Sequence, residues 1–154
     1  MTTVLLDTGV IGVACHPSRR VPFMAIWEWL EALRGAGHTV VIPEIADYEL
    51  RRELLRLGRL AAVATLDQLG ADFLYLPLSS STMRSTASLW AQSRQRGQIT
   101  AHDHALDGDV ILAAQALALA KQGERCVVAT TNVRHLTWFV DARTWDSIDP
   151  TSLA

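Results

Sequence analysis

Cysteine, lysine and long apolar runs are all scarce in this sequence of 154 residues. The two cysteines, Cys15 and Cys126, lie far apart and match no zinc spacing, so neither a structural disulfide nor a zinc site is expected. The longest apolar stretch, VILAAQALALA, is interrupted by Gln115 and is too short to span a bilayer. No signal peptide precedes the first apolar run, so we expect a cytoplasmic protein without membrane attachment. The formal net charge of −2 gives no overall electrostatic sign of nucleic-acid binding.

Short apolar runs alternate with amphipathic segments along the whole chain. Strands that alternate with helices predict an α/β fold with a parallel sheet and right-handed crossovers. At this length we expect a single domain that spans residues 1–154. Strands are predicted at 3–7, 38–43, 72–76 and 126–130, with an edge strand in ARTWDSI, and helices at 23–34, 44–57, 59–70, 82–96 and 107–122.

Acidic and amide side chains recur at the corners between strands and helices. Apolar runs precede Asp7 and Asn132, and helical patterns follow Glu49 and Asp109. Because a parallel sheet gathers the carboxyl ends of its strands on one edge, these side chains can share one pocket. Carboxylates held that close together need a cation, and oxygen ligands favour Mg²⁺ or Mn²⁺ over zinc or copper.

Two of these acids also have a purely structural explanation. Asp7 could cap a helix, but Gly9, Gly12 and two prolines follow it, so we do not expect a helix to begin at once. Glu49 could lie with Glu53 on a solvated helix face, since residues four apart share a face. Spacing alone does not decide whether Glu49 points towards Asp7.

The segment LDGDVILAA adds two more acids, Asp107 and Asp109. Asp107 fits the N-cap of the predicted helix, and Asp109 would then lie in its first turn, where the helix dipole stabilises a negative charge. A metal role is therefore expected for Asp109 more than for Asp107. Further along, Thr130, Thr131 and Asn132 can orient a carboxylate, or can simply cap the next turn.

Taken in order, these motifs resemble the PIN domain family, and within it the VapC-like toxin ribonucleases. LDTGV at 6–10 is similar to the family's opening LDTNV, and the segment that ends in Glu49 and Leu50 is similar to its P…EL segment. DVILAA at 109–114 is similar to D-x-x-I-A-A, and TTNVRHL at 130–136 to T-x-N-x-x-H/D-F. The ordered set covers about residues 3–148. The resemblance implies a three-layer α/β/α fold with a central, mainly parallel sheet of four to five strands.

The resemblance also implies a metal-dependent endoribonuclease site. Asp7, Glu49 and Asp109 take the places of the three core acids and would hold Mg²⁺ or Mn²⁺. Asn132 stands near the place of a fourth acid and supplies less charge. We therefore expect Asp7, Glu49, Asp109 and Asn132 to be catalytic, and we hypothesise that Asp107 joins the three core acids as a metal ligand. Replacing Asp107 with Asn should then weaken Mn²⁺ binding.

Contacts to the RNA substrate are expected from Thr8, Thr130, Arg51 and Arg134, with Arg52 as a further candidate for steering the RNA backbone.

Protein partners follow from the same resemblance, which implies an antitoxin and a homodimer. Apolar helices around Trp27, Trp29 and Trp90 could supply either interface, with burial in the core as the alternative.

Two other functions remain open on the sequence alone. Phosphoryl transfer onto Asp7 would need a lysine near the pocket, and the sole lysine, Lys121, falls at the far end of a predicted helix. A non-catalytic PIN-like module that binds RNA or a protein would fit the neutral Asn132. The three retained acids favour a working site, because they repel one another unless a cation is bound.

Overall fold

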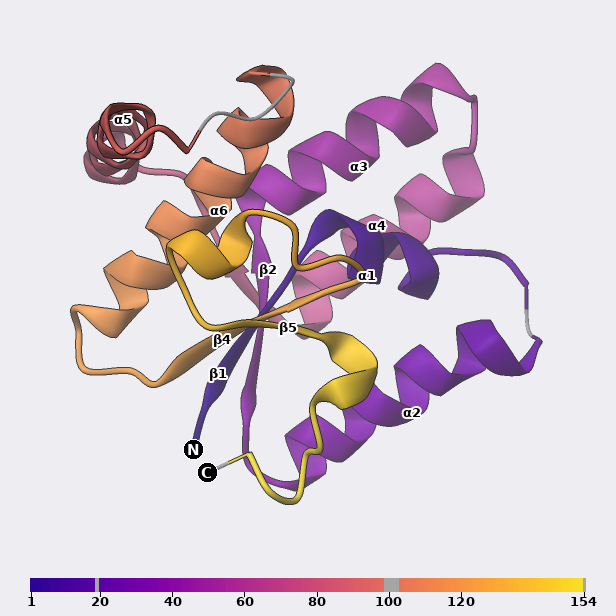
Figure 1. The fold of residues 1–154 in the computed structure, drawn as a ribbon. Helices are drawn as coiled ribbons and strands as arrows, with labels where there is room; N and C mark the ends of the chain where they lie inside the picture. The colour runs from indigo at the N-terminus through magenta and orange to yellow at the C-terminus, as the bar shows by residue number, and fades with distance from the viewer. Residues whose placement is uncertain (19, 99–102, 154) are drawn as a thin grey trace.

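The computed structural model of the chain describes residues 1–18, 20–98 and 103–153, and the side chains of 103–106 lie outside that description. A five-stranded sheet forms its centre, in the order β3-β2-β1-β4-β5 (Figure 1). Each neighbouring pair of strands is parallel. The predicted parallel sheet is confirmed, including its edge strand. The strands are β1 (Thr3–Leu6), β2 (Thr39–Pro43), β3 (Leu74–Leu76), β4 (Cys126–Thr130) and β5 (Ala142–Thr144).

Successive residues of the central strands serve opposite faces of the sheet. Val4 and Leu6 of β1 belong to one buried cluster, whereas Leu5 between them belongs to a second cluster. In β2 and β4, Val41 and Val128 lie on the same side as Leu5. Because both faces are buried, the strands read as continuous apolar runs in the sequence.

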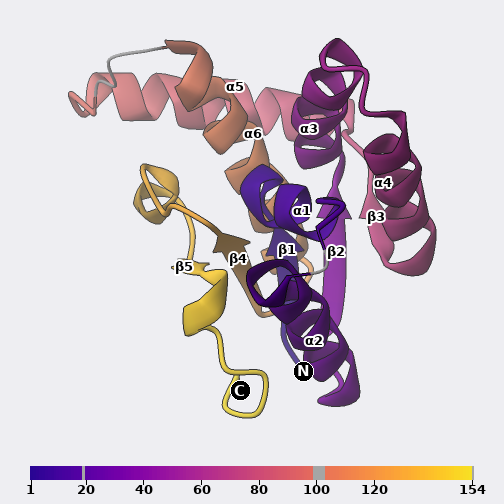
Figure 2. The same ribbon diagram turned by 90° about the vertical axis from the view of Figure 1, so that its right-hand side faces the viewer.

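Helices cover both faces of the sheet and complete the three-layer α/β/α arrangement (Figures 1 and 2). The cluster of Leu6 is closed by α1 (Thr8–Ala14), α2 (Val21–Gly35), α3 (Glu44–Arg56) and α4 (Leu60–Asp72). The opposite cluster is closed mainly by α6 (Asp103–Ala120), and α5 (Ser80–Gln95) packs against α6. Two short 3₁₀ helices follow β4 and β5, namely η1 (Leu136–Trp138) and η2 (Trp145–Ser147). Among the described residues, every helix is too short or too polar to span a lipid bilayer.

The first departure from the sequence prediction is the start of α1 directly after β1. Asp7 is its N-cap, and the carboxylate accepts the backbone N–H of Thr8 at 2.7 Å. Gly9 does not break this helix but allows it to approach the end of β4, because a Cβ on Gly9 would lie 2.3 Å from Oγ1 of Thr131. Both prolines follow α1 rather than interrupt it.

The second departure is the start of α6. The helix begins at Asp103, so Asp107 is an interior position and not the N-cap that the sequence predicted. Gly108 lies inside the helix for a packing reason: a Cβ there would come within 2.8 Å of Oε1 of Glu49 on α3. The glycine thus leaves room for the carboxylate of Glu49 and does not form a turn.

The tryptophans belong mainly to the core. The buried indole of Trp29 donates to the carbonyl of Ile148 at 2.9 Å, and that of half-buried Trp27 donates to the carbonyl of Ala14 at 3.1 Å. Trp90 is 36% exposed. Of the three, Trp90 alone remains a candidate for a protein interface.

Candidate active site

An acidic pocket of about 380 Å³ lies where β1 and β4 end. Three acids line it: Asp7 at the end of β1, Glu49 on α3 and Asp109 on α6. β1 lies between β2 and β4 (Figure 1). α1 and α3 begin where β1 and β2 end, and α6, which leads into β4, brings Asp109 to the same sheet edge. This is the edge where open parallel sheets bind ligands. The remaining lining residues are Thr8, Gly9, Arg52, Thr130, Thr131, Asn132 and Arg134.

The carboxylate of Asp7 is held by two donors. Its Oδ1 accepts the backbone N–H of Thr8 at 2.7 Å, and its Oδ2 accepts the hydroxyl of Thr130 at 2.6 Å. The hydroxyl of Thr130 also lies 3.0 Å from the carbonyl of Asn132, but a short bond to a charged acceptor is the stronger one. Thr130 is fully buried. Its position therefore suits orienting Asp7 better than the direct substrate contact that the sequence suggested.

The three acids act on one another electrostatically. Burial, and then the charge of Asp7, raise the pKa of Asp109 to about 6, while Arg134 opposes that rise. Burial and Asp7, in that order, also raise the pKa of Glu49, and Arg52 lowers it in part. Such mutual repulsion in one pocket is what a bound cation would relieve.

The side chains of the pocket suit a hard divalent cation. Among the described residues, its lining offers carboxylate and hydroxyl oxygens and contains no cysteine or histidine, a set that favours Mg²⁺ or Mn²⁺. The hydroxyl of Thr8 is buried without a hydrogen bond of standard geometry, although it lies near enough to Glu49 to lower its pKa slightly. Within the described ranges, no three His, Cys, Asp or Glu side chains already form a coordination cluster. A bound ion would therefore have to draw the carboxylates closer together.

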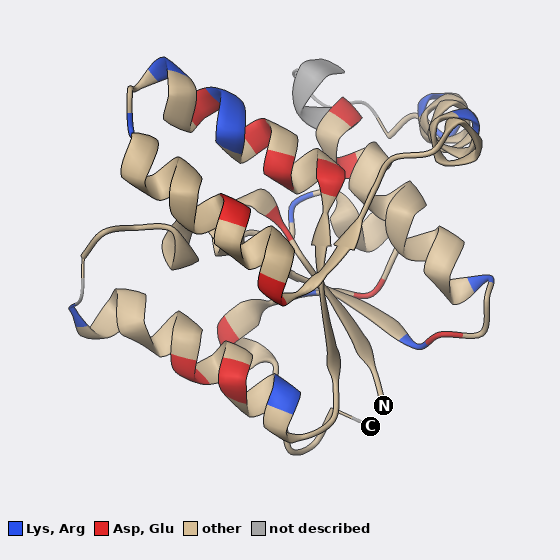
Figure 3. Cartoon of the chain, turned by 180° about the vertical axis from the view of Figure 1, so that it is seen from behind, with Lys and Arg blue, Asp and Glu red and all other residues tan. Residues whose placement is uncertain are grey.

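Two arginines, Arg52 and Arg134, also line the pocket. The φ angle of Arg134 is 38°, the only positive φ of a non-glycine residue in the described part of the chain. Its backbone N–H donates to Oδ1 of Asn132 at 3.1 Å. Asn132 thus uses its side-chain oxygen to hold the turn that places Arg134 at the pocket. Figure 3 shows other Lys and Arg positions spread over several helix ends and loops.

The structure does not bring Arg51 to the acidic pocket. Arg51 pairs with Asp47 on its own helix and with Asp67 on α4, with N–O distances of 2.7 Å in both pairs. One helical residue turns the side chain by about 100°, and the next residue, Arg52, lines the pocket instead. The sequence prediction of Arg51 as a substrate contact is not supported by its position.

Asp107 also lies outside the acidic pocket. It is exposed and lines an apolar groove between α5 and α6 together with Met83, Trp90 and Ile111. In this position Asp107 does not supply the charge that Asn132 lacks, so the proposed compensation is not supported. Sequence reasoning missed Gly108, whose one signal is a glycine between two acids inside an otherwise helical pattern.

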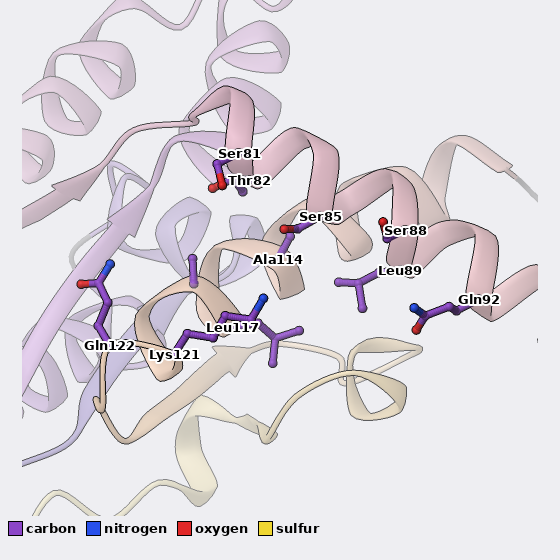
Figure 4. A pocket seen from close by; sticks show the side chains of 11 residues that line it. Ser81, Thr82, Ser85, Ser88, Leu89, Gln92, Ala114, Leu117, Lys121 and Gln122 are labelled. Carbon is purple, nitrogen blue, oxygen red and sulfur yellow. The ribbon is translucent and has the colours of Figure 1, made fainter.

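A larger groove of about 480 Å³ lies elsewhere, between α5 and α6 (Figure 4). Its wall includes Ser81, Ser85 and Ser88 on one side and Lys121 on the other. None of its described lining residues is acidic. Size alone therefore does not single out the candidate site, whereas converging titratable groups with raised pKa values favour the acidic pocket.

The fold is similar to that of chains in solved VapBC structures. No family model matches this sequence, and no curated protein matches it either. The crystal structure of VapBC2 from Rickettsia felis bound to a promoter DNA fragment contains a similar chain. That chain has a TM-score of 0.70 and 18% identity, and the match covers 94% of this chain and 100% of that one. A chain of VapBC-1 from nontypeable Haemophilus influenzae matches with a TM-score of 0.62 and 15% identity, over 95% of this chain and 100% of that one. At these identities the likeness is one of fold, and this chain has a three-layer α/β/α, PIN-like fold.

Proposed function

We propose that this protein is a Mg²⁺- or Mn²⁺-dependent endoribonuclease and the toxin of a toxin–antitoxin pair. The observation that carries the proposal is the convergence of Asp7, Glu49 and Asp109 in one pocket at the carboxyl edge of the sheet. Burial and the charge of Asp7 raise the pKa of Glu49 and of Asp109, so keeping these acids charged in one pocket is costly, which favours a site that uses their charge.

Each side chain of the pocket has a distinct part in the proposed reaction. Asp7, Glu49 and Asp109 would hold the ion, which supplies positive charge to offset that of the phosphodiester. Thr130 keeps Asp7 in one orientation. Arg52 and Arg134 would contact the phosphates of the RNA strand, since a guanidinium forms strong charge-assisted hydrogen bonds with phosphate oxygens.

The experiment that tests this proposal is cleavage of a pool of cellular RNA. The wild-type chain should cleave RNA with Mn²⁺ and fail to do so with EDTA, and Asp7→Asn should be inactive with either. Asp107→Asn is the matched control, because it makes the same change of charge outside the acidic pocket and should leave cleavage unchanged. RNA that stays intact with Mn²⁺, or equal cleavage by Asp7→Asn, would contradict the proposal.

A non-catalytic RNA-binding module is the second candidate. The observation that favours it is the neutral Asn132, whose side-chain oxygen is engaged by the backbone of Arg134. This candidate predicts that the wild-type chain binds RNA but leaves it intact with Mn²⁺. Phosphoryl transfer onto Asp7 has less support, because Lys121 lines the larger groove between α5 and α6, beside Ser81 and Ser85, and not the acidic pocket.

We further propose a cognate antitoxin as a partner, a homodimer, a single domain and a cytoplasmic location. The likeness to two VapBC structures supports the antitoxin. Copurification of the chain with the small protein encoded beside it would test that partner, and light scattering of the purified chain would test the homodimer.

A further inference from the structure

Tyr48 carries the most exposed aromatic ring of all Phe, Trp and Tyr residues in the described ranges. The residue is 55% exposed, against 37% for Trp138 and 36% for Trp90. It lies on α3 directly before Glu49, which is a wall residue of the acidic pocket. The guanidinium of Arg52 lies over the ring, 5.1 Å from its centroid. Arg52 also lines the acidic pocket, so its side chain extends from the exposed ring to the pocket wall.

Arg52 differs from the other arginines of α3. Arg51 and Arg56 both form ion pairs with carboxylates. Among the residues that the structure describes, Arg52 forms no ion pair; it lies over the ring of Tyr48, and its charge also lowers the pKa of Glu49 and of Glu53. A guanidinium that lies over a ring face interacts through its charge and keeps N–H groups available to a ligand.

We propose that Tyr48 and Arg52 form a stacking subsite for one unpaired nucleobase of the RNA, next to the phosphate that enters the acidic pocket. This inference rests on the proposed nuclease function and names the form of its substrate. Bases of single-stranded RNA have free faces, which stack on aromatic rings and on guanidinium planes. In a duplex those faces are covered by neighbouring bases, so this subsite selects an unpaired nucleotide beside the cleavage point.

The test measures binding, separately from cleavage. The full chain carrying Asp7→Asn is titrated in EDTA against a labelled single-stranded oligonucleotide of mixed sequence, and binding is followed by fluorescence anisotropy. Asp7→Asn also removes one charge that repels phosphate. Adding Tyr48→Leu should weaken binding about 10-fold, since one stacked base contributes roughly that much. Tyr48→Phe keeps the ring and loses only the hydroxyl, so it should bind as its parent does.

Trp90→Leu is the matched control. Trp90 is also exposed and also has an arginine over its ring, with Arg94 4.9 Å from the centroid, but it lines the groove of Asp107 instead of the acidic pocket. It should leave RNA affinity unchanged. A duplex of the same sequence should bind Tyr48→Leu and its parent equally.

Oligonucleotides that lack one base at a time locate the contact. Removing the base that contacts Tyr48 should weaken binding to the parent chain and to Tyr48→Phe. It should not weaken binding to Tyr48→Leu further, because the loss of the base and the loss of the ring remove the same interaction. Equal affinity of Tyr48→Leu and its parent for single-stranded RNA would overturn the stacking subsite and point to a protein contact for the ring. The nuclease proposal would still stand. An equal loss with Trp90→Leu would also overturn it. No RNA binding by the parent, with no cleavage by the wild type, would overturn both.

Discussion

The hydroxyl of Thr130 donates to Oδ2 of Asp7 at 2.6 Å, across 123 positions of the sequence. Asp7 follows β1 and Thr130 ends β4, and these two strands are paired in register, with Leu6 opposite Ala129. The backbone N–H of Asp7 continues that pairing by donating to the carbonyl of Ala129 at 2.9 Å. The orientation of the acid is therefore set by the pairing of two central strands and does not depend on a mobile loop.

Thr130→Val removes this hydroxyl and keeps the shape of the buried side chain. Loss of a partner that orients a metal ligand costs about 10- to 100-fold in metal affinity or activity, and we expect a loss of that size in Mn²⁺ affinity and in RNA cleavage. The free energy of unfolding should fall by about 1 kcal/mol. Calorimetric titration with Mn²⁺ and thermal melting measure the two effects. Thr130→Ser, which retains the donor, is the control, and a Val variant with unchanged Mn²⁺ affinity would show that Asp7 does not need this bond.

Gly108→Ala adds a methyl group 2.8 Å from Oε1 of Glu49. The carboxylate must move away, so we expect weaker Mn²⁺ binding and slower RNA cleavage. The fold should survive, because alanine is favoured over glycine inside a helix by up to about 1 kcal/mol. Gly35→Ala is the control, since Gly35 is also helical and an added Cβ there meets nothing within 4 Å. Equal Mn²⁺ affinity of Gly108→Ala and wild type would mean that Glu49 can reposition freely.

The sheet and the meeting of the acids were predictable because they depend on sequence patterns that are short and local. The run before Asp7 and the run before Asn132 are buried on both faces, so each reads as an unbroken apolar strand. Once the strands are parallel, their carboxyl ends meet on one edge without further information. Asp7 follows β1 directly, and Asp109 reaches the same edge because α6 leads back into the parallel strand β4.

The rotation of α3 was not predictable from its own residues. Arg51 and Arg52 are adjacent, and charged residues occur on most of the surface of the helix, so the pattern does not say which arginine faces the pocket. Arg51 pairs with Asp47 on its own helix and with Asp67 on α4, and this second partner cannot be read from the pattern of α3. The early start of α6 was not predictable for a similar reason. In the sequence Gly108 indicates a loop, and its packing against Glu49 is apparent only in the structure.

Asp109→Asn should stabilise the chain at neutral pH in the absence of metal. The pKa of Asp109 is about 6 in the folded state against an ordinary 3.8, so the folded state binds the proton more tightly than the unfolded state. Its favourable contribution is fully present below pH 3.8 and is lost as the pH rises through about 6. Thermal melting in EDTA should therefore show the variant above wild type at about pH 7 to 8, with the difference vanishing near pH 4. A variant that melts below wild type at about pH 8 would contradict repulsion among the three acids.

Asn132→Asp should increase the affinity of the pocket for Mn²⁺. Oδ1 of Asn132 accepts the backbone N–H of Arg134 at 3.1 Å, and an aspartate can accept the same bond, so the turn should persist. The second oxygen then adds a negative charge where the neutral amide stands. We expect tighter Mn²⁺ binding or a second equivalent in calorimetric titration, with a lower melting temperature in EDTA because a fourth carboxylate increases the repulsion. Asn132→Ala is the comparison, since it loses the turn bond and gains no charge, and it should bind Mn²⁺ no better than wild type. If Asn132→Asp and Asn132→Ala gave the same affinity, the amide would matter only for the turn that places Arg134.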